Sequence, residues 1–280
     1  PPDDICFCGN KWRKLKYNLI RARAAGHQQL LTFGGAYSNH IAAVASAGKL
    51  FGFSTIGIIR GEEHLPLNPT LWHAKEMGMR TQYMSRSEFR LKEDQAVLEK
   101  LEEKHGAAYV IPEGGTNSSA LQGVAELVGE LRAQTTIDNQ TYLTVSCGTG
   151  GTMAGLIKGM AGQGKILGFP ALKGDFMTKE IQKLLAEQQI EWDNWSVNSD
   201  YHFGGYAKHK PELVAFMREF AAEYKIKLDP IYTSKLFYGV FDLIKKGAFE
   251  VGSKVVVVHT GGLQGIKGWE ERFGKGGSLL

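Results

Sequence analysis

Residues 142–160 read YLTVSCGTGGTMAGLIKGM, and this stretch decides the fold. The apolar run over 142–146 predicts a buried strand, and the apolar spacing over 152–160 predicts a helix. Glycines and threonines at 148–152 join the two. A strand that passes through a tight glycine loop into a helix is the building unit of an α/β protein with a parallel sheet.

The same alternation of strand and helix continues along the chain. The run Val255–Val258 predicts a central strand within 254–259, because central parallel strands are apolar on both faces. The units are too unequal for a closed barrel, so we expect an α/β fold with two open, twisted parallel sheets covered by helices. Further strands are predicted over 30–33, 54–60, 80–84, 109–111 and 166–169, and further helices over 39–52, 71–78, 92–105, 118–132, 178–188, 211–224 and 234–246.

Composition limits the classes of function. The 280 residues are 43% hydrophobic and 22% charged, which is typical of a soluble globular protein. Net charge is only +4 and the basic residues are spread out, so no nucleic-acid partner is expected. No apolar run is long enough for a membrane helix, and three cysteines make no disulfide framework, so we expect a cytoplasmic protein.

The first residues carry two expectations. Pro1-Pro2-Asp3-Asp4 does not read as a complete first element, and we expect residues to be missing ahead of Cys8. Cys6 and Cys8 have no second cysteine or histidine pair nearby, so no metal site is predicted.

The glycine loop Gly148-Thr149-Gly150-Gly151-Thr152 follows a strand, where open α/β sheets bind ligands. Its backbone N–H groups, its two hydroxyls and the dipole of the next helix favour an anion. The loop lacks the lysine of a Walker loop and the spacing of a dinucleotide fingerprint. The predicted ligand is therefore a single phosphomonoester, and a tight turn without a ligand is the alternative.

Residues 9–14, GNKWRK, place a lysine between a predicted Gly-Asn turn and an amphipathic helix. A lysine becomes a nucleophile when burial or neighbouring cations lower its pKa, and Arg13 and Lys14 are such neighbours of Lys11. Most basic runs of this kind are solvated helix faces, and that interpretation stays open at this point.

Three further segments carry side chains suited to a small charged ligand. Ser38 and Asn39 are either a helix N-cap or a carboxylate site, and His40 either orients a substrate or fills the first helical turn. Tyr232 precedes a helix and serves either packing or a site. Thr260 follows the valine run, where its hydroxyl bonds either the local backbone or a ligand.

A reactive lysine, a phosphomonoester loop and a carboxylate-binding helix end together suggest pyridoxal phosphate and an amino-acid substrate. At these positions the chain resembles the tryptophan-synthase-β-like pyridoxal-phosphate enzymes of fold type II. Within them it is most similar to the family of 1-aminocyclopropane-1-carboxylate deaminase and D-cysteine desulfhydrase. The motifs that carry the resemblance are 9–15, 38–40, 112–115, 148–152, 229–233 and 259–262.

The resemblance implies an architecture and a set of cofactor contacts. A small α/β domain would cover 15–117, and a large cofactor-binding α/β domain would combine 1–14 with 118–280. Lys11 would bond covalently to the cofactor, while Lys14 and the loop Gly148, Thr149, Gly150, Gly151 and Thr152 would hold its phosphate. Asn39 would bond its phenolic oxygen and Thr260 its ring nitrogen. Members of the family are usually homodimers.

The resemblance also implies roles in the reaction. Ser38, Asn39 and His40 would bind the substrate carboxylate. Ser38 would relay a proton on the face opposite Lys11, which would itself act as base or proton shuttle. Tyr232 would stack near the cofactor ring or assist proton transfer.

Two threonines favour one reaction within the family. Thr233 stands where the deaminases carry a glutamate that reaches the ring nitrogen, and the hydroxyl of Thr260 could meet that nitrogen instead. A neutral hydroxyl supports a weaker electron sink, which suffices to expel thiolate but suits the opening of a cyclopropane less well. We therefore expect α,β-elimination from a small D-amino acid, foremost D-cysteine, to pyruvate, ammonia and hydrogen sulfide. Deamination of 1-aminocyclopropane-1-carboxylate, elimination or racemisation of serine, and a binding protein without turnover are the alternatives.

Overall fold

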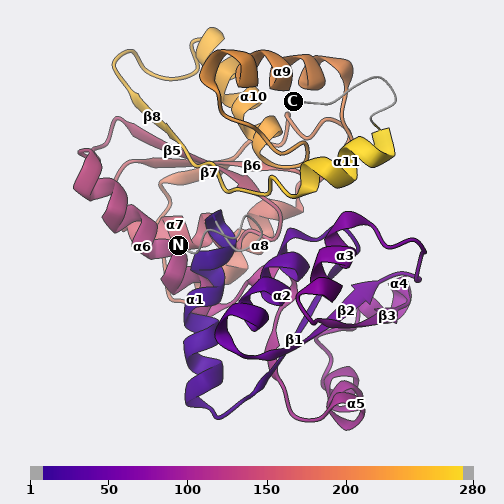
Figure 1. Ribbon diagram of the computed structural model, residues 1–280. Coiled ribbons are helices and arrows are strands. Elements are labelled where there is room, and N and C mark those ends of the chain that lie inside the picture. The colour runs from indigo at the N-terminus through magenta and orange to yellow at the C-terminus, as the bar shows by residue number, and fades with distance from the viewer. Residues whose placement is uncertain (1–8, 274–280) are drawn as a thin grey trace.

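Two four-stranded parallel sheets organise the chain, with strand orders β3-β2-β1-β4 and β7-β6-β5-β8. The computed structural model describes residues 9–273. In Figure 1 the sheet of the later residues lies above that of the earlier ones. The fold is therefore α/β with two open parallel sheets covered by helices, as the sequence predicts. Among the described residues, each helix is too short or too polar to cross a membrane.

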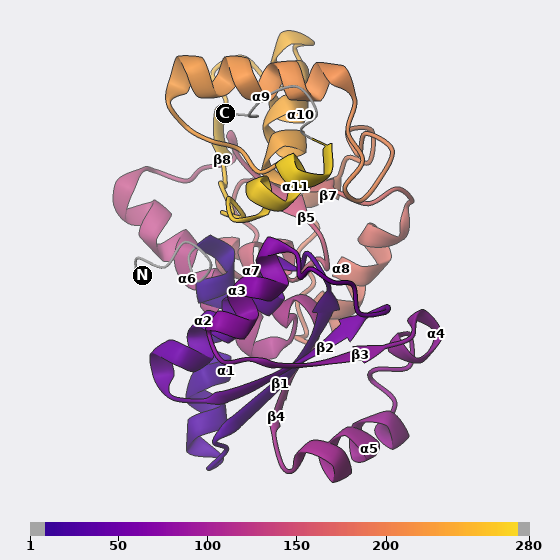
Figure 2. The same ribbon diagram turned by 45° about the vertical axis from the view of Figure 1, so that its right-hand side comes forward.

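The first sheet places apolar residues on both of its faces. Leu30 and Ile59 join the core with α2 and α3, whereas Leu31 and Ile58 join the core with α5. Figure 2 shows α2 and α3 on one face and α5 on the other. The elements are β1 (Gln29–Gly35), α2 (Asn39–Phe51), β2 (Ser54–Arg60), α3 (Pro69–Glu76), β3 (Arg80–Met84), α4 (Arg86–Phe89), α5 (Gln95–His105), β4 (Tyr109–Ile111) and the 3-10 turn η1 (Glu113–Gly115).

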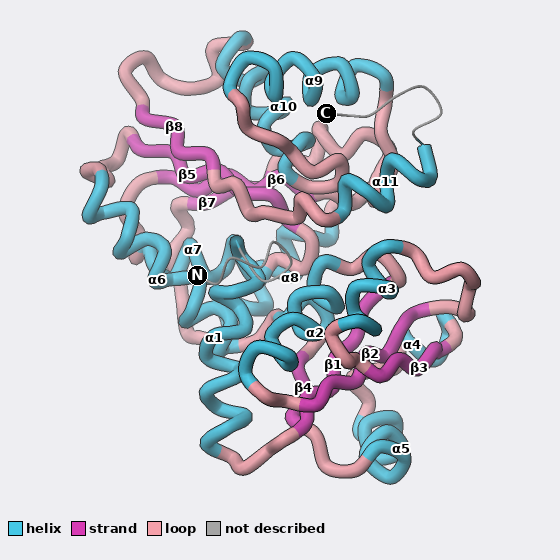
Figure 3. Tube along the Cα trace, in the orientation of Figure 1, coloured by secondary structure: helices cyan, strands magenta, loops and turns pink. Residues whose placement is uncertain are grey.

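The second sheet is likewise covered on both faces. In Figure 3, α9 and α10 lie on one face, and α6, α7 and α8 lie on the other. The elements are α6 (Ser118–Gln134), β5 (Thr141–Cys147), α7 (Gly151–Met160), β6 (Lys165–Pro170), α8 (Phe176–Ala186), β7 (Trp195–Val197), α9 (Pro211–Tyr224), α10 (Thr233–Lys245), β8 (Lys254–Val257) and α11 (Gly265–Phe273).

The prediction that 254–259 forms a central strand is wrong. Among the described residues β8 pairs with β5 alone, so it is an edge strand. Val256 and Val258 pack against the core below the sheet, and Val255 and Val257 pack against the core above it. A β-branched run reports that both faces are covered, which says nothing about whether both edges are paired.

The start of the first helix also differs from the prediction. Helix α1 (Gly9–Ala24) includes Gly9 and Asn10, so Lys11 lies inside its first turn rather than after a Gly-Asn turn. Gly9 enters the helix with a φ of +62°, which glycine tolerates. The sequence analysis also left β7, α4 and α11 unassigned. The expectations about residues 1–8 lie outside the described residues.

Helix α1 packs against the core of the first sheet and also against α6, which covers the second sheet. Its residues Leu15 and Leu19 belong to the core of the first sheet. On another face, Arg13 makes a two-bonded ion pair with Glu130 of α6, with N–O distances of 2.8 and 2.7 Å. Figure 1 shows α1 between α6 and α2. Because α1 is shared in this way, the domain boundaries at residues 15 and 117 stay a prediction.

We expect Gly123→Ala to lower the free energy of unfolding by about 1–3 kcal/mol, the usual cost of overpacking. A Cβ at Gly123 would lie 2.0 Å from the backbone oxygen of Arg13, so α1 and α6 would have to separate. Urea unfolding measures the change. Gly129→Ala is the matched control on the same helix, because a Cβ there meets nothing within 4 Å. Equal effects of the two substitutions would contradict the close packing of α1 on α6.

Candidate active site

The first turn of α1 docks on two loops at the carboxyl ends of neighbouring strands. The backbone N–H of Asn10 donates to the Thr260 carbonyl oxygen at 3.3 Å, in the loop after β8. The Asn10 side chain donates to Thr152 Oγ1 at 3.0 Å, in the loop after β5. A Cβ at Gly9 would lie 2.4 Å from the Thr260 oxygen. Lys11 is thereby held at the edge of the sheet where parallel α/β folds bind ligands.

Lys11 is partly buried and has a carboxylate in its electrostatic range. Burial lowers its pKa to about 8, and Asp229 offsets part of that shift. Asp229 is 1% exposed and accepts hydrogen bonds from the backbone N–H groups of Ile231, Tyr232 and Thr233 at 2.9, 3.0 and 2.7 Å. These donors lower the pKa of Asp229, but burial raises it by more.

Lys14 lies one turn further along α1 and is 1% exposed. Its Nζ donates to Thr116 Oγ1 at 2.8 Å, and that hydroxyl bonds Thr149 Oγ1 at 2.6 Å. The Nζ atom is 3.1 Å from the position that a Cβ at Gly151 would take. Burial, and then the charge of Lys11, lower the pKa of Lys14 well below its ordinary value. The Lys14 amine therefore lies against the first residue of α7, in surroundings that disfavour its charged form.

The glycine loop itself is packed on two sides. A Cβ at Gly148 would lie 3.1 Å from the ring of Tyr232, and one at Gly114 would lie 2.8 Å from Thr149 Oγ1. Gly150 caps α7 with a φ of +76°. The loop thus brings the Thr149 hydroxyl and the N-terminus of α7 close to Lys14, and it places the Thr152 hydroxyl against Asn10. Such a donor set, with a buried cation, fits a phosphomonoester.

Ser38 and Asn39 occupy the start of α2. Ser38 Oγ accepts from the backbone N–H groups of His40 and Ile41 at 3.2 and 3.3 Å, so the N-cap interpretation is confirmed. These bonds leave the hydroxyl hydrogen of Ser38 available to donate. Asn39 Nδ2 lies 2.8 Å from where a Cβ at Gly262 would stand, so it meets the loop after β8.

His40 is 2% exposed and lies behind this helix start. Its Nε2 is 2.8 Å from Thr32 Oγ1, which donates its only hydrogen to the Ile111 carbonyl. The backbone of Pro112 offers the ring a second hydrogen bond, so the tautomer of His40 decides which ring nitrogen donates. Burial, Lys11 and Lys14 lower the pKa of His40 well below its ordinary value, so it is neutral. A direct contact with substrate stays a prediction.

Tyr232 and Thr260 both lie near the carboxyl end of β5, Tyr232 against Gly148 and Thr260 against Ser146. Burial raises the pKa of Tyr232 well above 10, so its phenol keeps its proton. Thr260 Oγ1 is 3.2 Å from Ser146 Oγ at the end of β5. Thr233 is fully buried and its hydroxyl donates to Asp229 Oδ1 at 2.8 Å.

The sequence analysis assigned no role to four residues that the structure brings to this site: Asp229, Thr116, Ser146 and Tyr206. Asp229 stood inside a quoted motif, and its position five residues before a predicted helix was the available signal. Tyr206 follows the pair Gly204-Gly205, and its ring centroid is 6.3 Å from that of Tyr232. Thr116 and Ser146 directly flank segments that were singled out. Their pairing with Thr149 and Thr260 depends on contacts between distant segments.

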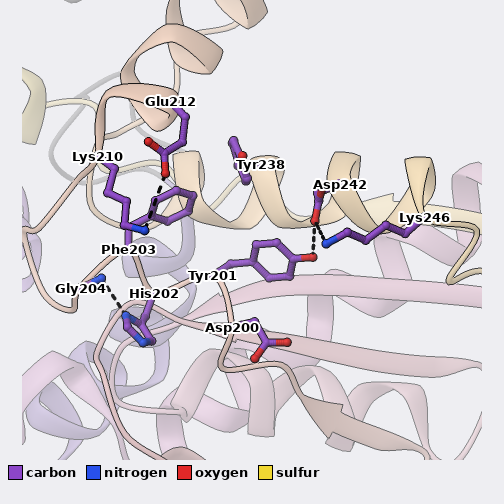
Figure 4. Close-up of a pocket in the computed structure, with 10 residues that line it drawn as sticks. All are labelled: Asp200, Tyr201, His202, Phe203, Gly204, Lys210, Glu212, Tyr238, Asp242 and Lys246. Atoms are coloured by element: carbon purple, nitrogen blue, oxygen red, sulfur yellow. Dashed lines mark hydrogen bonds and ion pairs between the residues drawn. The ribbon is translucent and has the colours of Figure 1, made fainter.

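A cavity of about 450 Å³ lies elsewhere, between residues 200–204 and α10 (Figure 4). Tyr201 Oη donates to Asp242 Oδ2 at 2.6 Å on its wall, and Lys246 pairs with the same oxygen. The residues that line it include none of the predicted site residues. The cavity is therefore separate from the lysine site.

We expect the free amine of Lys11 to appear as pH rises through about 8 in the protein without a bound ligand. Competitive labelling with acetic anhydride, read by mass spectrometry, measures the midpoint. Asp229→Asn removes the charge that raises the pKa of Lys11, so its midpoint moves to lower pH. Lys16 is the internal control, because Glu126 raises its pKa. A Lys11 midpoint near the ordinary 10.5 would contradict this electrostatic description.

Comparisons with known proteins identify the family of the chain. The family model described as "Pyridoxal-phosphate dependent enzyme" matches residues 7–261. A putative 1-aminocyclopropane-1-carboxylate deaminase of Pyrococcus horikoshii is 34% identical over 267 residues, covering 92% of this chain and 81% of that protein. A bifunctional D-cysteine desulfhydrase/1-aminocyclopropane-1-carboxylate deaminase, mitochondrial, of Arabidopsis thaliana is 29% identical, covering 92% of this chain and 69% of that protein.

Solved structures support the same family and the same fold. The crystal structure of an ACC deaminase homologue superposes with a TM-score of 0.82 at 31% identity, covering 97% of this chain and 84% of that chain. Threonine deaminase isoform 2 from Solanum lycopersicum reaches a TM-score of 0.63 at 15% identity, covering 96% of this chain and 76% of that chain, and shares the fold. The chain therefore belongs to the pyridoxal-phosphate dependent enzymes of fold type II, in the family of 1-aminocyclopropane-1-carboxylate deaminase and D-cysteine desulfhydrase.

Proposed function

We propose that this enzyme converts D-cysteine and water to pyruvate, ammonia and hydrogen sulfide by α,β-elimination. The observation that carries the choice of substrate is the pair of neutral hydroxyls, Thr233 and Thr260. Thr233 is committed to Asp229, and Thr260 faces Ser146. A carboxylate at either position would support a stronger electron sink, which the departure of thiolate does not need.

The buried cationic site supports a place for the cofactor. Lys11 would bond pyridoxal phosphate covalently, and Lys14 with residues 148–152 would hold its phosphate. Asn39 and Thr260 would contact the ring. The bound cofactor supplies an electron sink that stabilises the negative charge left at Cα of the substrate. Burial lowers the pKa of both lysines, and a phosphate bound between them would favour their charged forms.

Different side chains of the protein would carry out the proton transfers and bind the substrate carboxylate. Lys11, with a pKa of about 8, can take up and return a proton near neutral pH. Tyr232 keeps its proton and can only donate. Ser38, the N-terminus of α2 and the Asn39 amide offer donors for a substrate carboxylate. Ser38 would also relay a proton on the face opposite Lys11.

Deamination of 1-aminocyclopropane-1-carboxylate is the second candidate. The relatives from Pyrococcus horikoshii and Methylobacterium nodulans carry that name, and they cover 92% and 97% of this chain. A protein that binds the cofactor without turnover is the candidate of another class. Assembly as a homodimer and a cytoplasmic location also stay predictions.

We expect sulfide and pyruvate from D-cysteine, with a kcat/KM at least about tenfold above that for 2-oxobutyrate from 1-aminocyclopropane-1-carboxylate, because the site lacks the stronger sink. The assay compares these two substrates with L-cysteine and both enantiomers of serine. A reversed ratio selects the deaminase. A protein that forms no keto acid from any substrate and does not interconvert the serine enantiomers is the binding protein.

We expect Lys11→Ala to lower kcat for elimination by about 10²–10⁴-fold, because it removes the group that bonds the cofactor and moves protons. Borohydride reduction and peptide mapping provide a second measurement: the wild-type protein retains the cofactor mass on the Lys11 peptide. Lys16→Ala is the control, since Lys16 pairs with Glu126 on the outer face of α1. Full turnover by Lys11→Ala would refute the assignment.

A further inference from the structure

Lys235 is a buried lysine that the proposed reaction does not use. It lies in the first turn of α10 and is 1% exposed. A cation at a helix N-terminus faces the positive end of the helix dipole, which disfavours the charged form of Lys235. Its burial disfavours the charged form as well. Burial lowers the pKa of Lys235 to about 8, and Asp229 offsets part of the shift.

Three backbone carbonyls compensate this ammonium group. Lys235 Nζ donates to the oxygens of Ala171, His202 and Gly205 at 3.2, 2.9 and 2.7 Å. An ammonium has three N–H donors, so each donor has its own acceptor. The acceptors belong to two separate loops, one after β6 and one between β7 and α9. Lys235 therefore ties both loops to the start of α10.

One of these loops needs such support. Phe203, Gly204, Gly205 and Ala207 all have positive φ, at 52°, 94°, 110° and 53°. Phe203 and Ala207 are not glycines, and such conformations persist only where the surroundings hold them. The 450 Å³ cavity in Figure 4 borders residues 200–204, and on that side the ring of Phe203 contacts that of Tyr238 at a centroid distance of 4.9 Å.

The same loop carries Tyr206 to the candidate active site. Tyr206 directly follows Gly205, and its ring meets Tyr232 edge to face, at a centroid distance of 6.3 Å and an interplanar angle of 66°. Tyr232 precedes Lys235 by three residues and packs against Gly148 of the phosphate loop. Lys235, at the start of α10, thus holds the loop that carries Tyr206. Tyr206 in turn contacts Tyr232, which lies at the same helix start.

We propose that Lys235 is a positioning residue that fixes the 202–207 segment and thereby sets Tyr206 against Tyr232. It acts as a tethered cation for three converging carbonyls. Its contribution to turnover rests on the proposed function, whereas its effect on the loop does not.

The first test measures amide hydrogen exchange of peptides covering 200–207 in Lys235→Met. We expect exchange there to be at least about tenfold faster than in the wild type, with β5 peptides unchanged. Lys254→Met is the matched control, because Lys254 also donates to a backbone carbonyl, that of Thr136, at 2.6 Å. Unchanged protection of 200–207 overturns the proposal, and this result does not depend on any activity.

A chemical rescue separates the cation from the side-chain packing. In Lys235→Ala, added n-propylammonium should restore protection of 200–207, while n-propanol at the same concentration should not. Equal rescue by both compounds, or by neither, overturns the tethered-cation role. Where the alanine variant does not fold, Lys235→Arg replaces it, and its retained charge should keep wild-type protection.

The second test asks whether Lys235 acts through Tyr206. With the amino acid that the substrate assay identifies, Lys235→Met should lower kcat by about tenfold with a smaller change in KM. In a Tyr206→Ala background the same substitution should change kcat less than about twofold, because coupled residues are not additive. Fully multiplicative effects overturn the link to Tyr206. If no amino acid is turned over, the proposed function fails and the exchange test alone decides on Lys235.

Discussion

The site depends on one constraint, which is that the first turns of α1 hold two lysine amines away from water, Lys14 fully and Lys11 in part. Removing a charge from water costs several kcal/mol per ion, and Lys14 also faces the positive end of the α7 dipole. Asp229 offsets part of this for Lys11, and Thr116 gives Lys14 one acceptor. A bound anion would favour the charged forms of both amines, so the predicted phosphate site depends on how α1 is placed.

The placement of α1 in turn depends on both sheets. Its apolar face completes the first core, its ion pairs lie on α6, and its first turn bonds the loops after β5 and β8. The start of α2 reaches the same loops, where Asn39 lies against Gly262 and the Tyr37 ring lies 3.2 Å from where a Cβ at Gly268 would stand. Lys11 and Lys14 therefore come from α1, whereas the groups predicted to bind the substrate carboxylate come from the start of α2.

Much of this arrangement could be predicted from the sequence, because strand, loop and helix signals are local. The β2, β3 and α9 bounds match the predicted ranges, and Ser38 caps α2 as its type suggests. The edge position of β8 could not be predicted, since both of its faces are covered whichever edge it takes. Lys235 gave no signal either, because a lysine near a helix start is ordinarily solvated and its three acceptors are backbone atoms of distant loops.

By itself, the sequence determined the fold class, and it predicted the phosphate loop and the lysine that would bond the cofactor, because each is written in a short run of neighbouring residues. Only the tertiary structure decided which charges and hydroxyls meet: Lys14 with Thr116 and Thr149, Thr260 with Ser146, and Asp229 with both Lys11 and Lys235. The physical reason is that desolvation and hydrogen bonding act across space. The pKa values, the proton donors and the loop positions are therefore properties of packed segments and not of their order in the chain.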